Sequence, residues 1–126
     1  MIHLDTHVAM WLWVGELDRL PARLKSRLES DDLAVSPMVR LELAYLHEVG
    51  RSTHAAERVL DGLARLIGVV EDATPFSDVV AVAAQVGWTR DVFDRMIAAQ
   101  ALAAGAHLAT RDRVIRAAIP EHTLWD

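Results

Sequence analysis

The stretch FDRMIAAQALAAGAHLATRD, residues 93–112, predicts a helix, a turn and a buried strand in direct succession. Its first part carries apolar residues at the spacing of one helix face, namely Phe93, Met96, Ile97, Ala101 and Ala104. Gly105 is the residue type that commonly ends a helix. The apolar run from 107 to 110 is short enough for a buried strand, and an acid, Asp112, follows it closely.

The rest of the chain repeats this alternation. The expected strands cover residues 2–5, 33–36, 67–70, 107–110 and, at an edge, 123–125. Apolar residues at helical spacing predict helices around residues 20–28, 37–50, 56–63, 76–87, 93–105 and 112–118. Ser52 or Thr53 is the expected cap of the third helix, and Gly87 the expected end of the fourth. Strands alternating with helices predict an α/β domain whose parallel sheet, of four to five strands, is covered on both faces.

The composition fits one globular domain over residues 1–126. The chain is 52% hydrophobic and has no Cys, which excludes a disulfide framework and is consistent with a reducing, cytoplasmic location. No run approaches the roughly 20 apolar residues of a membrane span, and the N-terminus lacks the basic region of a signal peptide. We therefore expect no membrane partner. The net charge of −5 leaves nucleic acid open as a partner, because 12 Arg and one Lys are present and Arg suits phosphate.

Four acidic residues stand at corresponding points of this pattern. Asp5 and Asp112 follow expected strands, and Glu42 and Asp94 lie on expected helices beside the apolar faces. Ligands of parallel sheets bind outside the carboxyl ends of the strands. Carboxylates gathered there repel one another, and Mg²⁺ or Mn²⁺, which prefer oxygen ligands, would relieve the repulsion. We therefore expect these four acids to form a metal site that acts on phosphate.

Each acid also has a purely structural explanation. Asp5, Asp91 and Asp112 are suited to capping the helices that follow them. Glu42 sits in the middle of a helix, where an ion pair with an Arg such as Arg40 or Arg51 would explain it equally well. Asp94 borders an apolar helix face, whereas Asp91 lies nearly opposite. We therefore assign Asp94 to the site, and Asp91 as helper or cap.

Several neighbours are candidates for supporting roles. Thr6 and Thr110 place hydroxyls beside Asp5 and Asp112, for a metal-bound water or for turn geometry. The Arg residues that border the acidic motifs are candidate phosphate contacts, with surface charge or ion pairing as the alternative: Arg90, Arg95, Arg111 and Arg113. Trp11 and Trp13 suit base stacking or a protein interface, and we favour the interface.

At these acids the chain resembles a PIN-domain ribonuclease of the VapC toxin family. LDTH, residues 4–7, resembles the opening strand of that family with its first catalytic Asp. The later motifs, in order, are SPMVRLEL at 36–43, RDVFDRMIAAQA at 90–101 and LATRD at 108–112, which place Glu42, Asp94 and Asp112. The chain departs from the pattern at Val92, where many relatives have Pro. This difference affects the helix start and not the acids.

The resemblance implies a three-layer α/β/α sandwich and Mg²⁺- or Mn²⁺-dependent cleavage of RNA by metal-activated water. It implies the catalytic and metal-binding set Asp5, Glu42, Asp94 and Asp112. It also implies a type II toxin–antitoxin pair, with a cognate VapB-like antitoxin and a toxin homodimer. Three alternatives remain: a non-catalytic PIN-like interaction module, a receiver-type signalling domain and a DNA-directed nuclease of similar fold. A receiver domain generally needs a Lys late in the chain, and the only Lys here is Lys25.

Overall fold

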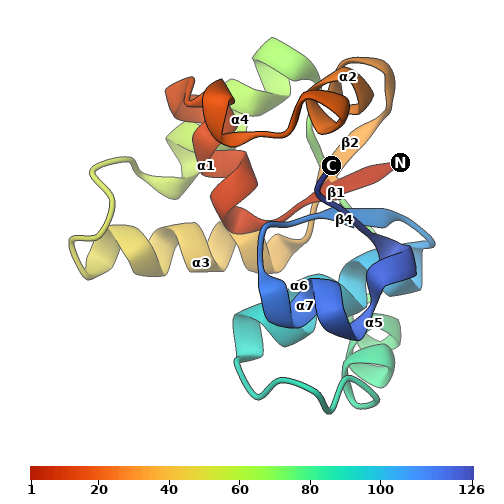
Figure 1. The fold of residues 1–126 in the computed structure, drawn as a ribbon. Helices are drawn as coiled ribbons and strands as arrows, with labels where there is room; N and C mark the ends of the chain where they lie inside the picture. The colour runs from red at the N-terminus through yellow and green to blue at the C-terminus, as the bar shows by residue number, and fades with distance from the viewer.

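The computed structural model describes residues 1–126 and contains a five-stranded sheet between two layers of helices (Figure 1). The strands are β1 (Ile2–Leu4), β2 (Leu33–Val35), β3 (Val70–Glu71), β4 (His107–Ala109) and β5 (Thr123–Leu124). The helices are α1 (Thr6–Val14), α2 (Ala22–Ser30), α3 (Pro37–Glu48), α4 (Ala56–Ile67), α5 (Phe76–Ala83), α6 (Val92–Ala104) and α7 (Arg113–Ala118). Two short 3-10 turns, η1 (Leu17–Arg19) and η2 (Pro120–His122), complete the chain.

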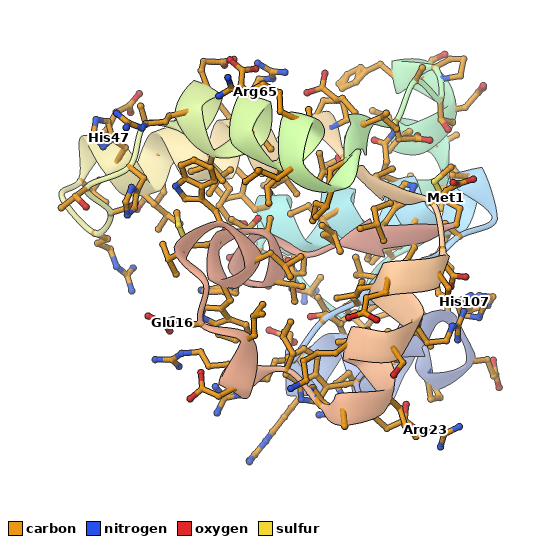
Figure 2. The ribbon with its side chains drawn as sticks, turned by 90° about the horizontal axis from the view of Figure 1, so that it is seen from above. Met1, Glu16, Arg23, His47, Arg65 and His107 are labelled. Carbon is orange, nitrogen blue, oxygen red and sulfur yellow. The ribbon has the colours of Figure 1, made fainter.

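The sheet is parallel throughout, with the strand order β3-β2-β1-β4-β5. In the central strand, Ile2 pairs with Leu33 on one side and with His107 on the other. Figure 2 shows Met1 and His107 on the same side of the molecule, at the amino ends of β1 and β4. All five strands therefore end at the opposite edge. The predicted α/β fold with a parallel sheet is confirmed.

Helices cover both faces of the sheet, as Figure 1 shows. Helices α1, α2 and α4 lie above the strands in that view, and α5, α6 and α7 lie below them. Helix α3 contacts both α4 and α6. The main core contains 20 buried hydrophobic residues from the sheet and from both layers, and a smaller cluster joins α5 to α6. No helix combines the length and apolar character needed to cross a bilayer.

Three predicted boundaries are wrong. The strand expected at 67–70 is only Val70–Glu71, because α4 continues to Ile67 and ends at Gly68, whose φ of 72° is left-handed. Neither Ser52 nor Thr53 caps α4, since its N-cap is Ala55. Helix α5 ends at Ala83, before Gly87. The first expectation placed Gly68, which ends α4, inside a strand, and the other two put helix boundaries at turn residues that lie outside the helices.

The Trp13 ring of α1 packs closely against the backbone of α4 at Gly62. A Cβ added at Gly62 would lie 2.0 Å from Cζ3 of Trp13, so only glycine allows this contact. In an exposed helix, Ala is usually more stabilising than Gly by about 1 kcal/mol. We nevertheless expect Gly62→Ala to destabilise the fold by about 1–3 kcal/mol through overpacking, as measured by urea unfolding. Gly87→Ala is the matched control, because a Cβ there meets nothing within 4 Å. A Gly62→Ala variant at least as stable as the wild type would contradict this packing.

Candidate active site

The carboxyl edge of the sheet contains a cleft of about 670 Å³. Its lining is mostly polar and includes every acid predicted from the sequence: Asp5, His7, Trp11, Glu42, Asp91, Asp94, Arg111, Asp112, Arg113, Arg116 and Trp125. Asp5 follows β1, and Asp112 comes three residues after the end of β4. Helices α3 and α6 bring Glu42 and Asp94 to the same space. The structure thus brings the four predicted acids together, with Asp91 as a fifth.

Asp5 is the most rigidly held of these acids. Its Oδ1 accepts a hydrogen bond from the backbone N–H of Thr6 at 2.8 Å, and its Oδ2 accepts one from the Thr110 hydroxyl at 2.6 Å. The backbone N–H of Asp5 donates to the carbonyl of Ala109 at 3.0 Å, which fixes β1 to β4 at this point. The side chain is only 5% exposed, and this burial raises its pKa above the ordinary value for Asp.

Glu42 is held by a hydroxyl group and not by an Arg. Its Oε1 accepts a hydrogen bond from Thr6. Arg40 instead pairs with Glu57 at 2.6 Å and with Glu71 at 2.9 Å, so it does not pair with Glu42. Burial raises the pKa of Glu42, and the charges of Asp5 and Asp91 raise it further. Thr6 therefore links two of the predicted acids.

Asp91 and Asp112 serve as helix caps and line the cleft at the same time. Asp112 accepts a hydrogen bond from the N–H of Ile115 at 2.9 Å, and Asp91 accepts one from the N–H of Asp94 at 3.0 Å. Each cap uses only Oδ1, which leaves Oδ2 without a protein partner. The capping interpretation was therefore right, and it does not compete with a role in the cleft.

Asp94 shows most clearly that the cleft disfavours ionised carboxylates. Burial raises its pKa, and the charges of the other four acids raise it further, to about 7. No hydrogen bond to its carboxylate offsets these effects. Ionisation of this side chain is therefore disfavoured in the cleft, and a bound cation would favour its ionised form.

The donor set fits a hydrated Mg²⁺ or Mn²⁺ ion. Every candidate ligand is a carboxylate oxygen, which is what hard divalent cations prefer. No three acids stand close enough to form a ready-made protein cage. Mg²⁺ does not need one, because it usually retains several waters and binds through one or two carboxylates plus substrate phosphates. The free oxygens of Asp91, Asp94 and Asp112 suit that mode of binding.

Two of the four predicted phosphate contacts line the cleft. Arg111 and Arg113 do so, and neither forms an ion pair. Arg95 instead donates from Nε to the carbonyl of Ala83 at 2.8 Å, which fixes α6 to α5, and Arg90 is exposed outside the lining. One residue of helix is about 100° of rotation, which is why Arg95 points away from the cleft that Asp94 faces.

Sequence reasoning missed two of the lining residues. Arg116 lies one turn after Asp112 on α7, and Trp125 follows β5 at the same edge of the sheet. The signal for Trp125 was present, because an edge strand was expected at 123–125 and the residue that ends it belongs at the carboxyl edge. Trp11 also lines the cleft, with its ring 6.0 Å from that of the exposed His7. The interface favoured for Trp11 and Trp13 stays a prediction.

Thr110 connects two acids of the site, Asp5 and Asp112, by hydrogen bonds. Its hydroxyl donates to Asp5 and accepts from the N–H of Asp112 at 3.0 Å. Thr110→Val keeps the shape but leaves two buried polar groups unpaired. We expect a loss of about 1–3 kcal/mol of stability, measured by urea unfolding, and a lower rate of cleavage. Thr53→Val, at an exposed Thr, is the control. Equal stability of Thr110→Val and wild type would refute the role of this hydroxyl.

Comparison with known proteins identifies the family of the chain. The PIN domain family matches residues 2–119. The chain is similar to Ribonuclease VapC22 of Mycobacterium tuberculosis, with 38% identity over 116 residues that cover 90% of this chain and 88% of that protein. Its fold is similar to that of VapBC2 from Rickettsia felis, determined with a DNA fragment from the promoter, with a TM-score of 0.65, 24% identity and full coverage of both chains. The family inferred from the four motifs is confirmed, and this chain belongs to the PIN-domain family as a member of its VapC group.

Proposed function

We propose that this chain is a Mg²⁺- or Mn²⁺-dependent endoribonuclease and the toxin of a type II toxin–antitoxin pair. The observation that carries the proposal is the convergence of five carboxylates in one cleft, where burial and then the charges of the neighbouring acids raise the pKa of Asp94 to about 7. Such an arrangement is unfavourable without a cation. Membership of the VapC group supports RNA as the substrate, and an RNA substrate together with the lack of Cys fits a cytoplasmic location.

The residues of the cleft have distinct roles in this proposal. Asp5, Glu42, Asp94 and Asp112 surround the place of the ion. One or two of these carboxylates would bind it directly and the others through its waters, and the bound ion would supply an activated water near neutral pH and neutralise charge on phosphate. Thr6 and Thr110 fix the orientation of Asp5 and Glu42. Arg111 and Arg113 contact the phosphates of the RNA. Because water is the nucleophile, the products carry a 5′-phosphate and a 3′-hydroxyl.

Two other surfaces support the proposed partners. An apolar groove of about 500 Å³ lies between η1, α2 and α4, and its lining includes Leu17, Leu28, Leu63 and Leu66. A groove of this kind suits the apolar face of an amphipathic helix, such as an antitoxin tail. Leu41, Tyr45 and Val49 form an exposed stripe along α3, at 54%, 45% and 49% exposure, which suits a homodimer contact.

The test is cleavage of mixed cellular RNA by the purified chain. We expect cleavage with Mg²⁺ or Mn²⁺, its loss on adding EDTA and its return on restoring the metal. End analysis is expected to find 5′-phosphates. A 2′,3′-cyclic phosphate would contradict the mechanism, because that product needs the ribose hydroxyl as nucleophile. No cleavage with any metal would favour the non-catalytic interaction module.

A further inference from the structure

A second cavity adjoins the acidic cleft. This second cavity has a volume of about 460 Å³ and is lined by residues of α7, η2 and the C-terminal segment. Three residues line both cavities, namely Arg113, Arg116 and Trp125. The two cavities therefore adjoin at these three side chains, and the surface that they form together is called the groove below; it extends from the carboxylates, past α7, to the end of β5.

The cations of this groove are unpaired. Arg111, Arg113 and Arg116 form no ion pair, although five carboxylates line the same cleft. Elsewhere on the surface Arg pairs readily, as Arg27 does with Asp31 and Arg40 with Glu57. Asp126, the acid of the second cavity, is itself 3.5 Å from Arg23. The groove thus offers three guanidinium groups without a carboxylate partner, of which Arg111 lies over the Trp11 ring, and their planar donors suit phosphate.

Trp125 supplies an aromatic surface beside these cations. Strand β5 runs parallel to β4, so Trp125 emerges at the same edge as the acids. Its ring lies 6.1 Å from that of Trp11, at an angle of 48°. The Trp11 ring is already surrounded, with the guanidinium carbons of Arg19 and Arg111 at 5.4 Å and 6.0 Å from its centre. Trp125 is partly buried, as Trp11 is, but it lines both cavities and no guanidinium group lies over its ring.

We propose that this groove is a subsite for one unpaired nucleotide of the RNA, next to the phosphate that is cleaved in the acidic cleft. The base stacks on Trp125, and Arg113 and Arg116 bind the adjoining phosphate. Trp11 is a positioning residue, since it holds Arg111 and supports Trp125. A base is free to stack on protein only when it is outside a duplex, so the subsite selects single-stranded RNA. The inference rests on the proposed ribonuclease function and assigns its substrate contacts.

The test compares kcat, KM and salt dependence on a pool of short single-stranded RNA. We expect Trp125→Leu to raise KM about tenfold, with the larger effect in KM and not in kcat, and Trp125→Phe to restore most of the binding. Arg116→Gln is expected to raise KM severalfold and to flatten the salt dependence by about one charge. Arg65→Gln, at an exposed position of α4 outside the groove, is the matched control. Thermal unfolding checks that each variant is folded.

Direct binding separates failure of the subsite from failure of the proposed function. Fluorescence polarisation of labelled single-stranded and duplex RNA gives affinity without cleavage. If the wild type cleaves RNA and Trp125→Leu does so with unchanged KM and affinity, the subsite is overturned and the nuclease stands. If the wild type binds RNA without cleaving it, and Trp125→Leu and Arg116→Gln weaken that binding, the subsite is supported and the proposed nuclease activity is overturned. Equal losses in Trp125→Phe and Trp125→Leu, or a preference for duplex, would also overturn the subsite.

Discussion

Replacing Asp5 by Asn is expected to lower kcat for RNA cleavage by about 10³-fold, which corresponds to about 4 kcal/mol of transition-state stabilisation. Asp5 is the acid that the structure holds most tightly, with both oxygens engaged and 5% of its surface exposed. Asn has the same shape and still accepts from Thr6. The substitution therefore removes one negative charge from the cleft. It also replaces the acceptor of the Thr110 hydroxyl by an amide donor, so we expect some loss of stability but a folded protein.

Asp32→Asn is the matched control for this experiment. Asp32 is exposed just before β2 and lies outside the cleft. Its variant is expected to cleave RNA at the wild-type rate. Circular dichroism and thermal unfolding establish that both variants are folded. An Asp5→Asn variant that retains a tenth or more of the wild-type kcat would show that Asp5 is only a cap of α1.

Replacing Asp94 by Asn is expected to stabilise the protein and to abolish its activity. The pKa of Asp94 is raised from 3.8 to about 7, first by burial and then by the surrounding acids. Below about pH 4 the carboxyl is protonated in both the folded and the unfolded chain, so it does not affect stability. Between pH 4 and 7 the unfolded chain loses the proton first, so stability falls as pH rises, and above pH 7 the full penalty is present. Asn removes that penalty.

The gain in stability of Asp94→Asn over the wild type is best measured by urea unfolding without metal at pH 8 and pH 5. One pKa unit corresponds to about 1.4 kcal/mol, and because Asp94 is partly exposed we expect only about 1–2 kcal/mol at pH 8, and less at pH 5. Mg²⁺ is expected to stabilise the wild type at pH 8 and to stabilise Asp94→Asn much less, because the ligand binds the folded state. Asp32→Asn again serves as control. A less stable Asp94→Asn variant at pH 8 would contradict the electrostatic description of the cleft.

Most of the sheet was predictable, because short apolar runs bounded by turn residues are typical of buried strands. Strand β3 was misplaced for a physical reason. Gly68 is left-handed and its N–H donates to the carbonyls of Ala64 and Leu63, so α4 ends directly after Ile67 and only two residues are left for pairing with β2. A two-residue strand is too short for any pattern to separate it from a helix end.

The acids of the site were predictable and their partners were not. Strand ends and helix faces locate Asp5, Glu42, Asp94 and Asp112, but the hydrogen bond from Thr6 to Glu42 joins residues 36 positions apart. Long-range contacts of this kind depend on how the elements pack. The same holds for buried Gln100, which bonds both Ser36 and Asp72 beneath the sheet. Its position on α6 gave no sign of either partner.

Binding of Mn²⁺ in the absence of RNA tests the central claim most directly. We would titrate the ion into the protein at pH 8 and follow the loss of the free-ion signal by electron paramagnetic resonance. The wild type and Asp32→Asn are expected to bind Mn²⁺ in competition with Mg²⁺, and Asp5→Asn and Asp94→Asn to bind it at least tenfold more weakly. Equal binding by all four proteins, or none by the wild type, would show that the acidic cleft is not a metal site.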